Sequence, residues 1–411
     1  LAAVGLAFPA QNLMISVAVG TGVGINALLS KSLGEKNYET ANRTAVNGIF
    51  LAFCSWAVFA VLGGFFARTF MELQTPVESI ADYGTTYLSI VAVVSVGMMF
   101  QICFERLLQS TGKTIFTMIS QATGAIINII MDPLLIFGVA PLPKMGIAGA
   151  AWATVLAQGL SAVCMAVYFL LRARELRPRR SNMHLDRGLL HLIFSNSVLT
   201  AVQQSIMNLG ILMVQGLVNS FGFAVSAAFA AVVKIDAFAY MPAQDFGNAF
   251  ATFVAQNYGA GKGDRIRRGL GTALKLSGGF CILSSACVAL LARPLMLLFI
   301  EPEETEIIAV GVTYLHIEGV FYIGIGILFL LYALYRGLGR PEMSIVLTVV
   351  SLGTRVALAY ALSAIPAIGV VGIWWSVPIG WALADVAGVV YYKRNRDRLL
   401  RPQQPQKGAN P

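Results

Sequence analysis

A carboxylate and a helix breaker stand inside the apolar stretch AIINIIMDPLLIFG, residues 125–138. Asn128 and Asp132 are four residues apart, so a helix would present both side chains on one face. Amide and carboxylate oxygens are ligands that hard cations prefer. Pro133 has no N–H, which leaves the carbonyl of Ile129 without its usual partner. A cation site and simple solvation of the helix end at the following loop fit this pattern equally well.

More polar groups interrupt apolar segments in the second half of the chain. Ionisable groups in such segments cost about 2.5–3.5 kcal/mol each on insertion scales and usually face a cavity. Candidates for the lining of a substrate cavity are Gln203, Asn208, Asp236, Tyr240, Met241, Asp245 and Glu318. Interhelical hydrogen bonding is an equally good interpretation of Gln203 and Asn208. Lys234 and Asp245 share a helix face, and either substrate binding or helix packing would explain them.

Composition indicates a membrane protein that crosses the bilayer many times. The chain has 411 residues, of which 57% are hydrophobic and 12% charged, whereas soluble domains carry about 25% charged residues. Its five cysteines lie in apolar segments without a CxxC pair, and its three histidines form no metal-binding motif. We therefore expect no metal site and no cofactor, apart from a possible Na⁺. A nucleotide-binding loop and a catalytic constellation are also absent from the sequence, so we expect no enzyme and no direct use of ATP.

Eleven segments reach the length of about 20 mostly apolar residues that a spanning helix requires. They are 1–28, 45–66, 86–109, 115–137, 146–171, 189–218, 224–256, 269–292, 305–335, 343–364 and 369–392. Prolines at 9, 133, 242 and 378 are expected to kink some of them. The fold class predicted here is all-α and polytopic.

The 29 basic residues are concentrated in alternate connections, above all in the segments 172–188 and 393–411. Acidic clusters around Glu72–Asp82 and Glu301–Glu306 lie on the other side. This positive-inside pattern predicts that the basic side and the C-terminus are cytoplasmic. The net charge of +9 is therefore a topology signal, and we expect no nucleic-acid partner.

An internal repeat divides the chain into two homologous halves. SLGEKNYETANR (32–43) resembles NYGAGKGDRIRR (257–268), TTYLSI (85–90) resembles VTYLHI (312–317), and MGIAGAAW (145–152) resembles IGVVGIWW (368–375). The predicted organisation is an N-terminal lobe (1–171), a cytoplasmic linker (172–188), a C-terminal lobe (189–392) and a disordered tail (393–411). The second lobe has six spans and the first has five. We therefore expect two six-helix bundles, with the first helix missing from this chain.

The repeat also bears on Asp132. It places Arg355 opposite Asn128 and Ala359 opposite Asp132. The shared scaffold therefore does not require a carboxylate at this position, which favours a functional role for Asp132 in the first lobe.

Four stretches resemble the multidrug and toxic compound extrusion (MATE) family of bacterial efflux transporters: AVGLAFPAQNL (3–13), NIIMDPLLIFG (128–138), MGIAGAAWATVLAQ (145–158) and VAQNYGAGKGDR (254–265). The likeness covers nearly the whole chain. It implies a V-shaped pair of six-helix lobes in the plasma membrane. The implied activity is alternating-access antiport, in which H⁺ or Na⁺ is exchanged for organic, often cationic or amphipathic drugs. We expect a monomer in the lipid bilayer.

The resemblance also implies a cation-coupling site. In the family, an Asn and an Asp four apart on the fifth helix are joined by a Thr on the sixth, which here correspond to Asn128, Asp132 and Thr154. The family site includes an Asp on the first helix that this chain does not contain. An acidic residue that another branch carries on its seventh helix is absent from 189–218. The alternative function is a flippase of the same superfamily for lipid-linked precursors or oligosaccharides, although such proteins usually have more basic residues in the cavity.

Overall fold

The computed structural model describes residues 2–138, 143–173, 176 and 185–401. Over these residues the chain forms helices and no strand, which confirms the predicted all-α class. Two compact units can be separated, Leu1–Ala201 and Val202–Pro411, and each is described by itself. The division falls inside the long helix α7 (Arg187–Asn219).

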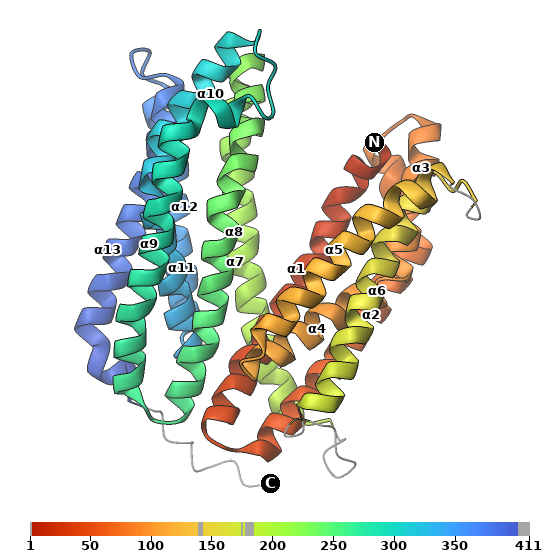
Figure 1. Cartoon of the computed structure of the whole chain (residues 1–411), viewed down its shortest axis with the longest axis vertical. Helices are drawn as coiled ribbons and strands as arrows, with labels where there is room; N and C mark the ends of the chain where they lie inside the picture. Colours follow the sequence, from red (N-terminus) through yellow and green to blue (C-terminus); the bar gives the residue numbers. More distant parts are fainter. Residues whose placement is uncertain (1, 139–142, 174–175, 177–184, 402–411) are drawn as a thin grey trace. The chain divides into compact units, whose positions relative to one another are not determined.

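Unit 1 consists of six helices and the beginning of α7 (Figure 1). Their bounds are α1 Ala2–Gly34, α2 Tyr38–Gln74, α3 Glu78–Val93, α4 Val96–Ser110, α5 Thr114–Phe137 and α6 Ile147–Arg172. Contacts between α5 and α6, between α4 and α6, and between α1 and both α2 and α4 hold the unit together.

Unit 2 contains the rest of α7 and the helices that follow it. They are α8 Phe223–Gly259, α9 Gly263–Met296, α10 Thr305–Glu318, the 3₁₀ turn η3 Gly319–Phe321, α11 Tyr322–Gly337, α12 Pro341–Ser363 and α13 Val370–Leu399. A core rich in aromatic side chains joins α8, α10 and α13, where Trp374 stacks on Phe229 and meets Tyr314 edge-on at 4.9 Å between ring centroids.

Within the described residues, ten helices are long and apolar enough to cross a membrane, and eleven if the bent pair α3 and α4 is counted as one span. This agrees with the eleven predicted segments. The helices run further than the apolar segments do, since α2 and α8 each contain 37 residues. Polar residues at their ends extend the helices beyond the hydrocarbon core.

The repeat is visible in the turns. Lys36 and Gly261, which the repeat aligns, both have a left-handed backbone, with φ of 58° and 68°. Gly112 and Gly339 form a second such pair, with φ of 81° and 70°. Matching turns in the two units show that the repeated sequence encodes a repeated fold.

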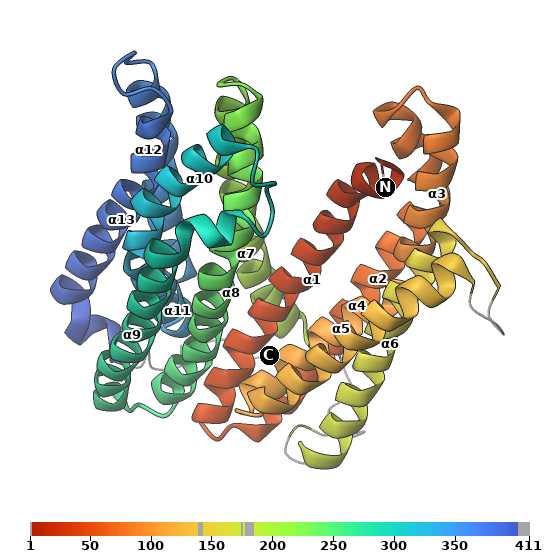
Figure 2. The ribbon, with the colours of Figure 1, turned by 45° about the horizontal axis from the view of Figure 1, so that its top comes forward.

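Each unit also has a span that is broken at an equivalent place. In unit 1, α3 and α4 meet at a bend of 43°. In unit 2, η3 separates α10 from α11, and Figure 2 shows α10 inclined to the neighbouring helices. The prolines at 9, 133, 242 and 378, where kinks were expected, lie inside continuous helices. Neither break contains a proline, so neither is marked in the sequence by the residue that most often kinks a helix.

The predicted disordered tail begins too early. Helix α13 continues to Leu399, so residues 393–399 are helical and not part of an unstructured tail. Arg396 and Arg398 lie in its last turn, where positive charge interacts favourably with the C-terminal end of the helix dipole. Most of the predicted linker 172–188 and the end of the tail lie outside the described residues.

Candidate functional site

The predicted cation site lies where α5 and α6 approach closely. At Gly149 of α6, a Cβ atom would be only 2.5 Å from the backbone oxygen of Leu135 of α5. Ser161 donates to the carbonyl of Ser120 at 3.1 Å, which ties the two helices together again towards the other end. Close packing at both ends fixes the distance between the helix faces that carry Asn128 and Thr154.

A polar cavity of about 320 Å³ opens between α4, α5 and α6. Its lining includes Asn128 and Thr154, together with Gln101, Gln121, Gly124, Ala125, Ala157, Gln158 and Ser161. The structure thus brings two of the three predicted residues together. Nδ2 of Asn128 is buried without a hydrogen-bond partner among the described residues, so this amide N–H is available to a hydrogen-bond acceptor in the cavity. Thr154 donates its hydroxyl to the carbonyl of Ala150 at 3.0 Å, which leaves its oxygen lone pairs free to accept.

Asp132 lies one helical turn beyond Asn128 and is half-buried, next to the cavity rather than in its lining. It interacts electrostatically with Tyr87 of α3. Tyr87 in turn donates a hydrogen bond to Gln11 of α1, with 3.4 Å between the oxygens. A tyrosine that the sequence alone did not single out is therefore close enough to feel the charge of Asp132.

The glutamines of this cavity were also missed. Gln121 lies seven residues before Asn128, which lies four residues before Asp132, so all three share a face of α5. This helical spacing could have identified Gln121 from the sequence. Its Nε2 donates to Glu105 of α4 at 2.5 Å. Glu105 also forms an ion pair with Arg106, at 3.8 Å. Polar groups therefore continue along α5 from Asp132 to Gln121, whose hydrogen bond leads on to Glu105 of α4.

The candidates of unit 2 do not gather into one site. Asn208, Met241 and Asp245 are exposed on their helices. Gln203 is buried and donates to Thr348 of α12 at 3.1 Å, which is the interhelical hydrogen bond that the sequence left open. Tyr240 packs edge-on against Phe329.

Asp236 and Glu318 are the exception. Both tyrosines that flank Glu318 in the sequence donate to Asp236: Tyr314 to Oδ2 at 2.7 Å, and Tyr322 to Oδ1. Neither tyrosine was named from the sequence, although TYLHIEGVFY places them four residues before and after Glu318.

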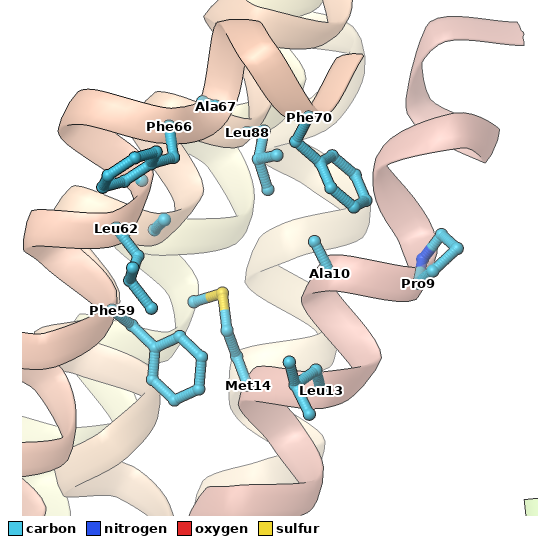
Figure 3. Close-up of a pocket in the computed structure, with 12 residues that line it drawn as sticks. Pro9, Ala10, Leu13, Met14, Phe59, Leu62, Phe66, Ala67, Phe70 and Leu88 are labelled. Atoms are coloured by element: carbon cyan, nitrogen blue, oxygen red, sulfur yellow. The ribbon is translucent and has the colours of Figure 1, made fainter. Parts of the chain in front are cut away.

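A second cavity of unit 1, of about 270 Å³, is apolar. Its lining comes from α1, α2 and α3 and includes Leu13, Met14, Phe59, Leu62 and Phe70. Figure 3 shows the Met14 side chain turned into the space towards Phe59 and Leu62. Such a surface can hold hydrocarbon.

No group of three or more His, Cys, Asp or Glu side chains that could hold a metal occurs in the part of the chain that the structure describes. Oxygen atoms of Asn128, Asp132 and Thr154 are hard donors, so they suit a proton or an alkali cation better than a transition metal.

Repeated bundles of spanning helices, with polar groups facing inner cavities, define a polytopic membrane protein of the transporter class. The MatE family profile matches residues 1–134 and 200–361. Because this is more than half of the chain, the chain belongs to the MatE family.

Two curated relatives match nearly the whole of this chain. The chain is 26% identical over 399 residues to the probable multidrug resistance protein YoeA of Bacillus subtilis, covering 95% of this chain and 85% of YoeA. It is 28% identical over 407 residues to an FAD transporter of Shewanella oneidensis, covering 96% and 86%.

A solved outward-facing multidrug resistance MATE transporter superimposes with a TM-score of 0.90 at 21% identity, covering 97% of this chain and 88% of that one. A MOP-superfamily transporter from Pyrococcus furiosus gives 0.89 at 21% identity, with the same coverage. At this identity the likeness establishes the fold alone. Together with the family match, it makes the chain a multi-pass membrane transporter of the MATE multidrug efflux family.

Proposed function

We propose that this protein is an antiporter that exports organic, often cationic or amphipathic drugs in exchange for H⁺ or Na⁺. Transport would proceed by alternating access. The observation that carries this proposal is the polar face of α5, where Asn128 and Asp132 stand beside a polar cavity inside a membrane-spanning bundle. A carboxylate inside an apolar spanning helix costs free energy. Binding of a cation in one state of the transport cycle would explain why the chain has a carboxylate there.

Asp132 would be the coupling group, and Asn128 and Thr154 would complete its site with neutral oxygens. Binding of a cation removes the negative charge that Asp132 carries. The repeat supports a functional role, because the aligned position in unit 2 is Ala359 and that unit folds without a carboxylate there.

Substrate class is supported by the cavities and by the relatives' names. The apolar cavity of unit 1 has a hydrocarbon lining, against which the ring systems of amphipathic drugs could pack. YoeA and other relatives are called multidrug resistance proteins. One relative is called an FAD transporter, so a flavin dinucleotide is the second substrate to test. A flippase for lipid-linked precursors remains the alternative within the superfamily.

The orientation of the chain in the membrane is inferred from the basic residues of its connections. We place the linker 172–188 and the C-terminus in the cytoplasm, because the basic residues concentrate on that side and cytoplasmic loops carry an excess of Lys and Arg. The protein would act in the plasma membrane as a monomer, with a lobe on each side of the linker.

The test is efflux from proteoliposomes in which a proton gradient and a sodium gradient are imposed separately. Wild-type protein should move a cationic dye under one of the gradients. Asp132→Asn should retain dye binding and lose gradient-driven transport, because a neutral amide has no negative charge for a cation to neutralise. Glu78→Gln, an exposed residue in the first turn of α3, serves as the matched control and should transport normally.

Each other outcome has a definite meaning. If Asp132→Asn transports as fast as wild type under the same gradient, the coupling site is assigned wrongly. If neither gradient drives the dye but FAD or a labelled lipid crosses the membrane, the drug-efflux proposal fails.

A further inference from the structure

Unit 2 has an apolar groove of about 260 Å³ between α8 and α9. Its lining includes Ile235 and Phe238 of α8 and Ser284, Cys287, Leu291 and Leu295 of α9. Phe238 and Leu291 are exposed, so the groove opens at the surface of unit 2. None of the side chains mentioned so far has a role in the proposed antiport.

The groove is the repeat counterpart of the apolar cavity of unit 1 that Figure 3 shows. The offset that places FFARTFMEL (65–73) opposite LLARPLMLL (290–298) also pairs the lining residues of the two spaces: Ala10 with Ile235, Leu13 with Phe238, Leu62 with Cys287 and Phe70 with Leu295. Side chains of different size and polarity thus form a groove at the same place in both units. The groove is therefore a feature of the repeated fold.

The length and the surroundings of the groove fit the acyl chain of a lipid. From Ser284 to Leu295, α9 rises by about 16 Å, and one leaflet of the hydrocarbon core is about 15 Å thick. Exposed apolar side chains continue beyond the groove on both helices, at Val233 of α8 and Leu290 of α9. On helices that span a membrane, an exposed apolar surface of this kind contacts lipid.

A lysine stands at one end of the groove. Lys234 lies one helical turn before Phe238, and its Nζ is 5.5 Å from the centroid of the Phe299 ring, which follows the end of α9. Phe299 comes four residues after Leu295, so the ammonium group lies just beyond the lining. Lys234 is exposed and forms no ion pair within the part of the chain that the structure describes.

The corresponding end of the unit 1 cavity is neutral. The repeat aligns Lys234 with Pro9 and Phe299 with Gln74. Nε2 of Gln74 donates to the carbonyl of Leu6 at 2.9 Å, which joins α2 to α1 at this end. The fold therefore does not require a lysine here, and an ammonium group in an apolar segment costs free energy unless an opposite charge compensates it.

We propose that the groove of unit 2 binds an anionic phospholipid of the bilayer, with one acyl chain along α9 and the phosphate group at Lys234. The lining supplies apolar contact for the chain, and the lysine attracts the negatively charged headgroup. A cationic drug would be repelled by the same ammonium group. The inference goes beyond the proposed antiport and does not depend on it, because lipid binding is measured without a gradient or a drug.

The experiment is photolabelling of the full chain in phosphatidylcholine vesicles that contain a trace of a lipid with a diazirine in its acyl chain. The probe is phosphatidylglycerol in one sample and phosphatidylcholine in the other, and mass spectrometry locates the labelled peptides. In wild type, phosphatidylglycerol should label 235–239 and 284–295 about fivefold more, the preference that one lysine gives towards anionic lipid. Segments 9–14 and 59–70 of unit 1 should show no such preference.

Removal of the charge tests the role of the lysine. Lys234→Gln should lower labelling of the unit 2 groove by phosphatidylglycerol to the level of phosphatidylcholine. Arg293→Gln is the matched control, since Arg293 is an exposed cation in the last turn of α9. It lies two residues from both Leu291 and Leu295 and hence on another face of the helix, so the preference should remain.

Filling the groove tests the place of the acyl chain. Cys287→Trp adds an indole at an exposed position of the lining and should reduce labelling of the unit 2 groove by both lipids. Leu62→Trp, its repeat counterpart, should leave that labelling unchanged.

The proposal is overturned if wild-type α8 and α9 are labelled equally by both lipids, or if Lys234→Gln keeps the preference. Failure of both lipids to label the groove would overturn it as well, because a second copy of the chain or another partner would then cover this face. Loss of transport in Asp132→Asn has no bearing on these results, so failure of either proposal can be recognised separately.

Discussion

At the scale of single residues, two aligned tyrosines donate to different kinds of acceptor in the two units. Tyr87 and Tyr314 occupy aligned positions, and each donates its hydroxyl to a side chain of another helix. In unit 1 the acceptor is the amide oxygen of Gln11 on α1, with 3.4 Å between the oxygens. In unit 2 it is a carboxylate oxygen of Asp236 on α8, at 2.7 Å. Hydrogen bonds to charged groups are shorter and stronger than neutral ones, so the two tyrosines should differ in their effect on stability.

Tyr314→Phe should lower the free energy of unfolding by about 1.5–3 kcal/mol, the usual range for hydrogen bonds to charged groups. Tyr87→Phe, its repeat counterpart, should cost about 0.5–1.5 kcal/mol, because its acceptor is neutral. Thermal unfolding in detergent measures both. Equal losses would show that Asp236 is not ionised when it accepts the hydroxyl.

At the scale of helices, glycine decides how closely α5 and α6 approach. The structure leaves no room for a Cβ at Gly149, since it would meet the backbone of Leu135 at 2.5 Å. At Gly372, its repeat counterpart, a Cβ atom would similarly lie only 2.9 Å from the backbone carbonyl carbon of Leu362. Because Asn128 and Thr154 face each other across the same helix pair, the packing at Gly149 also positions the proposed cation site.

Gly149→Ala should destabilise the protein by about 1–3 kcal/mol, the usual cost of overpacking, and should also weaken coupled transport by separating α5 from α6. Gly159→Ala on the same helix is the control. A Cβ there meets nothing within 4 Å, so the change should be neutral or stabilising by up to about 1 kcal/mol. The assignment of Gly149 to a tight helix contact would be wrong if both variants melted alike.

At the scale of the whole molecule, the charge asymmetry of the loops predicts how the chain lies in the membrane. Lys262 at the start of α9 belongs to the basic side, and Glu303 before α10 to the acidic side. Both side chains are exposed. The two positions lie at opposite ends of α9, which makes them a sensitive pair of markers.

Glu303→Cys should react with a membrane-impermeant maleimide on intact cells, whereas Lys262→Cys should react only after permeabilisation. Wild-type protein gives the background, because its five cysteines all lie within helices. The reverse labelling pattern would invert the topology and place the C-terminus outside.

Sequence alone was sufficient for the class of fold, the number of spans, the repeat and the candidate role of Asp132. Long apolar segments have few alternatives to a spanning helix, because every backbone polar group must be satisfied inside the bilayer. Loop charges and repeated motifs are equally local signals. Asn128 and Thr154 line one cavity, whereas their role in cation coupling stays a prediction.

Which polar residues contact one another could be decided only from the tertiary structure. The structure shows that Gln203 forms an interhelical hydrogen bond and that Met241 and Asp245 are exposed. It also shows that Asp236 accepts hydrogen bonds from the two tyrosines that flank Glu318 in the sequence. Helical periodicity gives the face of a residue but not the helix opposite it. The breaks between α3 and α4 and at η3 likewise occur without a proline, and only the structure shows them. The partners of a buried carboxylate are therefore a property of the assembled bundle, because they come from helices far apart in the chain.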